Sequence, residues 1–172
     1  MAIAIIFALG AAIVFIVYSL IQGKSVLGGS KNEAMAEEIG TVSANMSSHY
    51  TTEGSFAGAT TATEIANGDI PSGNVDTATG TVNTPYGGTL AVLGTASVNG
   101  GSNNAVGLGV NNLTQQECIK LAGTVSDYGT NSGTTVGAGV NSQNSVATDA
   151  QAATICTNAN GNSLAFTYTL GN

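Results

Sequence analysis

The stretch MAIAIIFALGAAIVFIVYSLIQ, residues 1–22, carries no charged side chain, and the first charged residue of the chain is Lys24. A helix rises about 1.5 Å per residue, so these residues span roughly 33 Å, enough to cross the hydrocarbon core of a bilayer. Large apolar side chains cover every side of such a helix, as expected where lipid or other helices surround it. Small residues such as Gly10 and Ala11 permit close contact between helices, although alanine as simple filler explains them equally well.

Three interpretations of this apolar segment are open. A secretory signal peptide needs a basic region before a shorter apolar core and a small-residue cleavage site, and the segment fits that pattern poorly. A permanent membrane anchor is physically adequate. The third interpretation is a helix that is first held in the membrane and is later buried against copies of itself. The remainder of the chain decides between the last two.

The 172-residue chain is poor in charge. Charged residues make up 8% of it, against about 25% in an ordinary soluble domain, and the part beyond the apolar segment is rich in Gly, Ser, Thr and Asn. This composition favours an extracellular surface whose solubility comes from hydroxyl and amide groups. The formal net charge is −7 and the basic residues are three widely spaced lysines, so nucleic-acid binding is not expected. The roughly 145 residues that follow the segment make one modest domain.

The chain has two cysteines, Cys118 and Cys156, separated by 38 residues. They do not form a metal-binding or redox Cys-x-x-Cys pair, and a disulfide formed in an oxidising compartment is favoured over two buried free thiols. A cross-link that closes a loop of this length stabilises a fold by roughly 3–4 kcal/mol in the chain-entropy model.

A glycine-rich link joins the apolar segment to an amphipathic helix. Residues 23–29, GKSVLGG, contain Gly23, Gly28 and Gly29, and each glycine weakens a helix by about 1 kcal/mol relative to alanine, so a hinge is expected. Residues 30–52 are expected to be helical, with a Ser-x-x-Glu capping box at the start. Their apolar residues recur every three or four positions and predict one buried stripe. The stripe consists of Met35, Ile39, Val42, Met46 and Tyr50.

The rest of the chain predicts a small antiparallel sheet with two short helices. Residues 53–86 are punctuated by Gly and Pro and are expected to form a long surface loop with a helical turn near 63–66. Residues 123–147 are expected to form an irregular loop or a weak hairpin. Strands are expected at 89–93, 96–98, 105–110 and 163–170, and helices at 113–122 and 149–154.

Few residues suggest chemistry. The single histidine, His49, lies on the amphipathic helix with no acid spaced in the sequence to orient it, so a nucleophile triad is not expected and His49 is interpreted as a surface or interface residue. The acidic residues of the distal part are dispersed, so neither paired carboxylates nor a calcium loop is predicted. We therefore expect no enzyme, no metal and no cofactor.

Three local motifs, in this order along the chain, carry a resemblance to a known family. They are YTTEGSF at 50–56, NTPYGGTL at 83–90 and LTQQECIKL at 113–121. Together with the apolar segment and the final strand, the chain resembles the type IV pilins over its whole length. Within them it is most similar to the type IVb group, which includes the toxin-coregulated and bundle-forming pilins and the PilS-like pilins of conjugative plasmids. The order of the motifs, rather than any one of them, carries the resemblance.

The resemblance implies an α+β pilin fold, in which a long N-terminal helix, interrupted near 23–29, packs on a small antiparallel sheet. The chain is expected to divide into residues 1–29, a membrane anchor that becomes the filament core, and residues 30–172, the globular domain. That domain would contain the helix at 30–52, the loop at 53–86 and a disulfide-closed region at 87–172. The residues expected to pack in the filament core are Ile3, Ile6, Phe7, Gly10, Ile13, Val14, Val17, Tyr18 and Ile21.

The resemblance also implies a life history for the protein. A prepilin peptidase would process it, residue Met1 would be N-methylated, and the chain would be held once across the inner membrane before assembly machinery extrudes it into a cell-surface pilus. The family usually has a glutamate five residues into the mature chain, where this chain has Ile5, so the usual docking of subunits is in doubt. A charge pair inside an apolar bundle has a large desolvation cost, so its absence need not weaken a filament.

The expected function is that of a structural subunit, the major pilin of a type IVb-like filament made of many copies of the chain. The pilus would serve conjugation, adhesion or colonisation. The alternative is a minor pilin or a membrane-anchored extracellular adhesin or binding module. A secretion-system pseudopilin fits less well because two cysteines close the terminal region.

Overall fold

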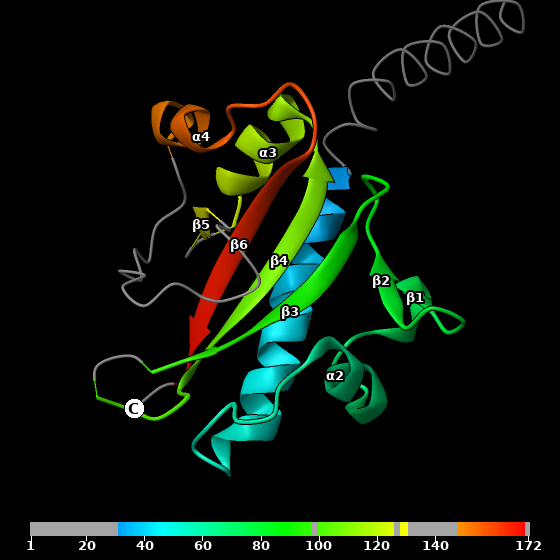
Figure 1. Cartoon of the computed structure of the whole chain (residues 1–172), viewed down its shortest axis with the longest axis vertical. Helices are drawn as coiled ribbons and strands as arrows, with labels where there is room; N and C mark the ends of the chain where they lie inside the picture. The colour runs from blue at the N-terminus through cyan, green and yellow to red at the C-terminus, as the bar shows by residue number, and fades with distance from the viewer. Residues whose placement is uncertain (1–30, 98–99, 126–127, 131–147, 171–172) are drawn as a thin grey trace, which may run out of the picture.

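The computed structural model describes residues 31–97, 100–125, 128–130 and 148–170. Over these residues the fold is α+β, as predicted, with a helix at residues 31–51 crossing one face of an antiparallel sheet (Figure 1). We call this element the long helix. The expected N-terminal part of a pilin fold, including the apolar segment 1–22 and the hinge at 23–29, lies outside the described residues.

The long helix buries the predicted apolar stripe. Met35, Ile39, Val42 and Met46 are fully buried, and Tyr50 is 4% exposed. Because these residues recur every three or four positions, they lie on one side of the helix and reach the core together. The predicted helix at 30–52 is therefore confirmed over residues 31–51, while Ser30 of the proposed capping box lies outside the described residues.

Within the described residues the sheet has six strands, in the order β1-β2-β3-β4-β6-β5, and every neighbouring pair is antiparallel. The final strand β6 lies inside the sheet between β4 and β5, so the end of the domain is held on both sides. Phe166 of β6, which is fully buried, pairs with Leu108 of β4 and with Tyr128 of β5. The strands are β1 Val75–Asp76, β2 Thr81–Asn83, β3 Thr89–Ala96, β4 Ala105–Leu113, β5 Tyr128–Thr130 and β6 Asn162–Thr169.

The short helices occupy the two ends of the sheet (Figure 1). Helix α2 (Thr61–Asn67) lies beside one end of the long helix, and α3 (Gln115–Ala122) and α4 (Asp149–Ile155) lie together at the opposite end. A 3₁₀ turn, η1 (Ser72–Asn74), precedes β1. Capping boxes start α3 and α4, at Thr114 with Glu117 and at Thr148 with Gln151, and satisfy backbone N–H groups at each helix start.

Three predictions about the elements need correction. In place of the strands expected at 89–93 and 96–98, one strand, β3, continues through Gly94 to Ala96 with an irregularity between Val92 and Gly94, and Val98 lies outside the described residues. The helix expected from 113 begins at Gln115, because Leu113 still pairs in β4. The region 53–86 is not simply a surface loop: the helical turn expected near 63–66 is confirmed as α2, but η1, β1 and β2 were not expected. The helix expected at 149–154 and the strand expected at 163–170 are confirmed with shifts of one residue.

Glycine is required at both adjacent positions of the NTPYGGTL motif, for a different physical reason at each. Gly87 has a φ of +76°, a left-handed conformation that favours glycine. A side chain at Gly88 would place its Cβ 2.2 Å from the backbone oxygen of Asn111. Both residues are needed for the tight entry into β3, where the backbones of two segments approach closely.

No helix in the described part of the chain is long and apolar enough to cross a membrane.

Candidate functional site

The predicted disulfide is present. Cys118 on α3 and Cys156 at the end of α4 are bonded, with a Cα–Cα distance of 5.8 Å, and both are fully buried. The amide of Gln115, at the start of α3, also donates a hydrogen bond of 3.0 Å to the carbonyl oxygen of Cys156. The disulfide and this hydrogen bond together join α4 to α3 at the end of the sheet.

Segment 53–86 is fastened along the long helix by polar side chains. Near one end the hydroxyl of Tyr86 donates to the side-chain oxygen of Asn32. In the middle the amide of Asn74 donates to Glu38 Oε1 at 3.0 Å. The side of the helix that faces away from the buried stripe stays open, with Thr41 and Ala44 exposed.

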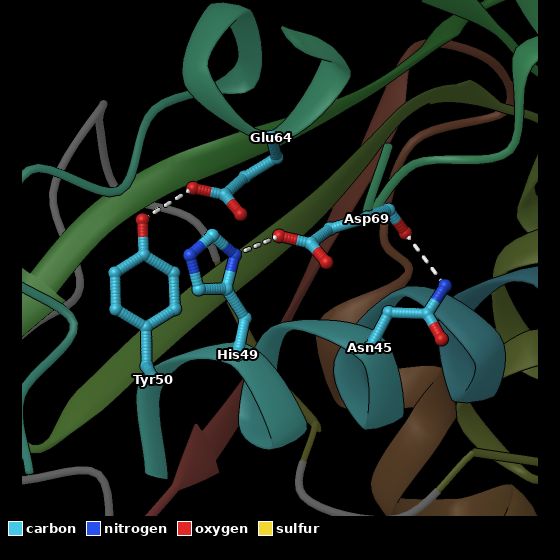
Figure 2. A network of polar contacts seen from close by, with 5 residues as sticks. All are labelled: Asn45, His49, Tyr50, Glu64 and Asp69. Carbon is cyan, nitrogen blue, oxygen red and sulfur yellow. Dashed lines mark hydrogen bonds and ion pairs between the residues drawn. The ribbon is translucent and has the colours of Figure 1, made fainter. Parts of the chain in front are cut away.

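A polar cluster fastens the same segment to the far end of the helix (Figure 2). The Tyr50 hydroxyl donates to Glu64 Oε1 at 2.8 Å, and His49 Nδ1 lies 2.8 Å from Asp69 Oδ2. The side-chain amide of Asn45 donates to the backbone oxygen of Asp69 at 3.0 Å. The rings of His49 and Tyr50 stack with their centroids 4.8 Å apart. We call His49, Tyr50, Glu64 and Asp69 the polar cluster.

The way in which α2 ends brings the two acids of the polar cluster together. Gly68 caps α2 in a left-handed conformation, with a φ of +82°. The chain turns there, so that the backbone amides of Asp69 and Ile70 both donate to the carbonyl oxygen of Glu64, at 2.9 and 3.3 Å. Ile70, 3% exposed, then anchors the turn in the core. Two acids five positions apart are thus placed beside one histidine.

Burial dominates the electrostatics of the polar cluster. Glu64 is fully buried, and loss of water raises the pKa of its carboxyl group, with the Asp69 carboxylate adding to the rise and the Tyr50 hydrogen bond opposing it. The hydrogen bond to Asp69 raises the pKa of His49. Burial also raises the pKa of the Tyr50 phenol, which therefore acts as a hydrogen-bond donor.

Sequence reasoning missed this polar cluster. His49 was predicted to have no acid to orient it, and that prediction is wrong, because Asp69 contacts it from 20 positions away. Glu64 and Asp69 look dispersed in the sequence, but the folded chain places both beside His49. The signal that marks them is the run Thr60 to Asp69, in which Thr60 caps α2 at one end and Gly68 at the other.

Of the functional residues predicted from the sequence, only Cys118 and Cys156 fall in the described part of the chain. The filament-core residues from Ile3 to Ile21, the hinge glycines Gly23, Gly28 and Gly29, and the processing site Met1 lie outside the described residues.

A comparison with family models identifies the chain. Residues 29–169 match the model described as PilS N terminal, which covers most of the 172-residue chain. No curated protein and no solved structure matches it. The match includes the disulfide, the long helix and the whole described sheet. The chain therefore belongs to the PilS-like family of type IV pilins.

Proposed function

We propose that the chain is the major structural subunit of a type IVb-like pilus, polymerising through helices formed by residues 1–22. The observation that carries the proposal is the order of its parts. A domain of the PilS-like family, matched from residue 29, follows an uncharged apolar segment that ends at residue 22, with only residues 23–28 between them. Such a segment in water requires other apolar surfaces around it, and identical segments of neighbouring subunits supply them.

The energetics favour a filament over dispersed subunits outside the membrane. At about 25 cal/mol per Å² of apolar surface, burying a helix of this size against its neighbours gains tens of kcal/mol relative to water. Lipid tails are as apolar as the segment, so association inside the membrane gains far less. Extrusion from the inner membrane therefore requires an assembly machinery, and prepilin peptidase processing would precede it.

The exposed side of the long helix supports the proposal. It combines small residues with two exposed acids, Glu33 and Glu37, and a side chain added at Gly40 would meet nothing within 4 Å. Small residues allow neighbouring helices to approach closely, as subunits in a filament must. The exposed small residues of this side are Ala34, Gly40, Thr41, Ala44 and Ser48.

The disulfide agrees with a surface location. Disulfides form and persist in oxidising compartments, and Cys118–Cys156 is fully buried in the domain that would face the outside of the pilus. The low charge of the chain suits the same environment.

The proposal is tested by shearing filaments from cells that produce the chain. The filaments should contain this chain as their most abundant protein, and mass spectrometry should find an N-methylated Met1 at its N-terminus. If the filaments contain the chain only in trace amounts, the chain is a minor pilin. Recovery solely as monomers in the membrane fraction would overturn the filament function and favour an anchored adhesin.

A further inference from the structure

One oxygen of the polar cluster has no hydrogen-bond donor. Glu64 is fully buried, and its Oε1 accepts from Tyr50, but its Oε2 has no hydrogen-bond partner among the residues that the structure describes. A buried carboxylate oxygen without a donor is costly, because it has lost water and gained nothing in exchange. Figure 2 shows this oxygen turned toward His49 and Asp69.

The side chains that Glu64 Oε2 faces, His49 and Asp69, are themselves able to bind a metal ion. The carboxylate of Asp69 is a second acceptor, so the two acids can be joined only by a cation placed between them, either a proton or a metal ion. His49 supplies a ring nitrogen from the other side. One ligand atom from each of His49, Glu64 and Asp69 can be chosen so that all lie within 4.8 Å of one another.

We propose that His49, Glu64 and Asp69 bind one zinc ion, which pins α2 and the turn after it to the end of the long helix. The side chain of Asp69 is 11% exposed and that of His49 is 38% exposed, so an ion can enter from the His49 side. Zinc sites with three protein ligands leave a fourth position for water, and the exposed edge of His49 provides access for it.

The choice of zinc follows from the ligand types. Calcium takes six to eight oxygen ligands and magnesium a near-ideal octahedron of oxygens, whereas zinc accepts both the imidazole nitrogen of a histidine and the carboxylate oxygens of Asp and Glu in four-coordinate sites. A tetrahedral zinc with bonds of about 2.0–2.1 Å places its ligand atoms about 3.3 Å apart. The 2.8 Å between His49 Nδ1 and Asp69 Oδ2 would open slightly, and the longer separations among the three ligand atoms, all within 4.8 Å, would shorten.

The surrounding residues suit this adjustment. The Tyr50 hydroxyl holds Glu64 Oε1 and leaves Oε2 for the metal, and the Asn45 amide holds the backbone of Asp69. Partners of this kind orient metal ligands and commonly change metal affinity by about 10- to 100-fold when they are removed. The His49 ring, exposed on one edge, is the ligand that can move with least disturbance to the core.

Zinc binding is measured on the full chain in detergent, produced without a histidine tag and stripped with EDTA. Isothermal titration should show one Zn²⁺ bound per chain, with no displacement by excess Ca²⁺ or Mg²⁺. Because His49 is the only histidine, its ring ¹⁵N resonances report on this site alone and should shift on addition of Zn²⁺. Absence of zinc uptake, or uptake that leaves the His49 resonances unchanged, would overturn the proposal.

Variants locate the ion. His49→Ala, at an exposed position, and Glu64→Gln, of nearly equal shape, should each weaken zinc binding at least about 10-fold. Glu53→Gln removes an exposed carboxylate near the cluster and should bind zinc as the wild-type chain does. Equal binding by the wild type and His49→Ala, or an equal loss in Glu53→Gln, would show that the ion lies elsewhere. The histidine resonances of the wild type test the site even if a variant fails to fold.

Discussion

At the scale of single residues, Glu64 shows how burial and hydrogen bonding oppose each other. The Tyr50 hydroxyl favours the charged carboxylate, while burial and the neighbouring Asp69 disfavour it, and the net effect raises the pKa of Glu64. A raised pKa means that the folded state binds this proton more tightly than the unfolded state does. Stability contributed by the proton is therefore present at acidic pH and is lost as the pH rises.

Glu64→Gln should remove this pH dependence. In the wild type, with EDTA present, the free energy of unfolding should fall as the pH rises above 4.5, the ordinary value for the group. Glutamine keeps an oxygen that accepts from the Tyr50 hydroxyl and does not titrate. The free energy of unfolding of the variant should therefore depend less on pH over this range. Above pH 6.5 both proteins should lose stability in parallel, because the raised pKa of His49 acts there.

Urea unfolding at a series of pH values, from about pH 4 to about pH 7, measures both curves. Parallel curves for wild type and Glu64→Gln below pH 6.5 would contradict the role assigned to the buried carboxyl group.

At the scale of elements, the apolar stripe of the long helix and the Cys118–Cys156 disulfide stabilise different parts of the domain. The stripe fixes the long helix on the sheet, and the cross-link fixes α4 on α3 at one end of it. The two act on different parts of the core, so their losses should add.

Met46→Ala should lower the free energy of unfolding by about 2–5 kcal/mol, because it leaves a cavity at a fully buried position of the stripe. Ser48→Ala, on the exposed side of the same helix, is the matched control and should change it by less than about 0.5 kcal/mol. Chemical denaturation followed by circular dichroism compares them. Equal effects of the two substitutions would mean that the stripe does not hold the helix.

The double variant Cys118→Ala with Cys156→Ala should be less stable by roughly 3–4 kcal/mol, since it removes the cross-link over 38 residues. The comparison requires non-reducing conditions, and reduced wild type should approach the stability of the variant. A loss below about 1 kcal/mol would show that the helix contacts hold this end of the domain without the bond.

The sequence was informative wherever a local pattern determined the structure. The spacing from Met35 to Tyr50 predicted the long helix, and the alternation around Phe166 predicted β6. The short strands β1 and β2 have too few residues to show a period, so they were missed. The contact between His49 and Asp69 depends on how segment 53–86 folds back on the helix, which no local pattern encodes.

At the scale of the whole molecule, the PilS-like domain and the apolar segment are suited to different environments. The described domain buries its own core and exposes polar and small residues. The apolar segment has no charged residue and needs either lipid or other copies of itself. In the proposed filament, the link at 23–29 must let the segments pack together while the domains cover the outside.

Replacing Gly23, Gly28 and Gly29 together with alanine should impair assembly, because alanine strengthens a continuous helix where a hinge is needed. Gly73→Ala is a matched control, since a side chain there would meet nothing within 4 Å. The measurement is the yield of sheared filaments at equal cellular levels of the chain. Normal yield from the triple variant would remove the hinge from the mechanism.

Electron cryomicroscopy of filaments sheared from cells that produce the chain tests most directly whether residues 1–22 form a filament core. We predict a helical assembly of this chain, with residues 1–22 packed as helices along its axis and the domain of residues 31–170 on the outside. A surface filament built from another protein, with this chain left as a monomer in the membrane, would contradict the proposed function.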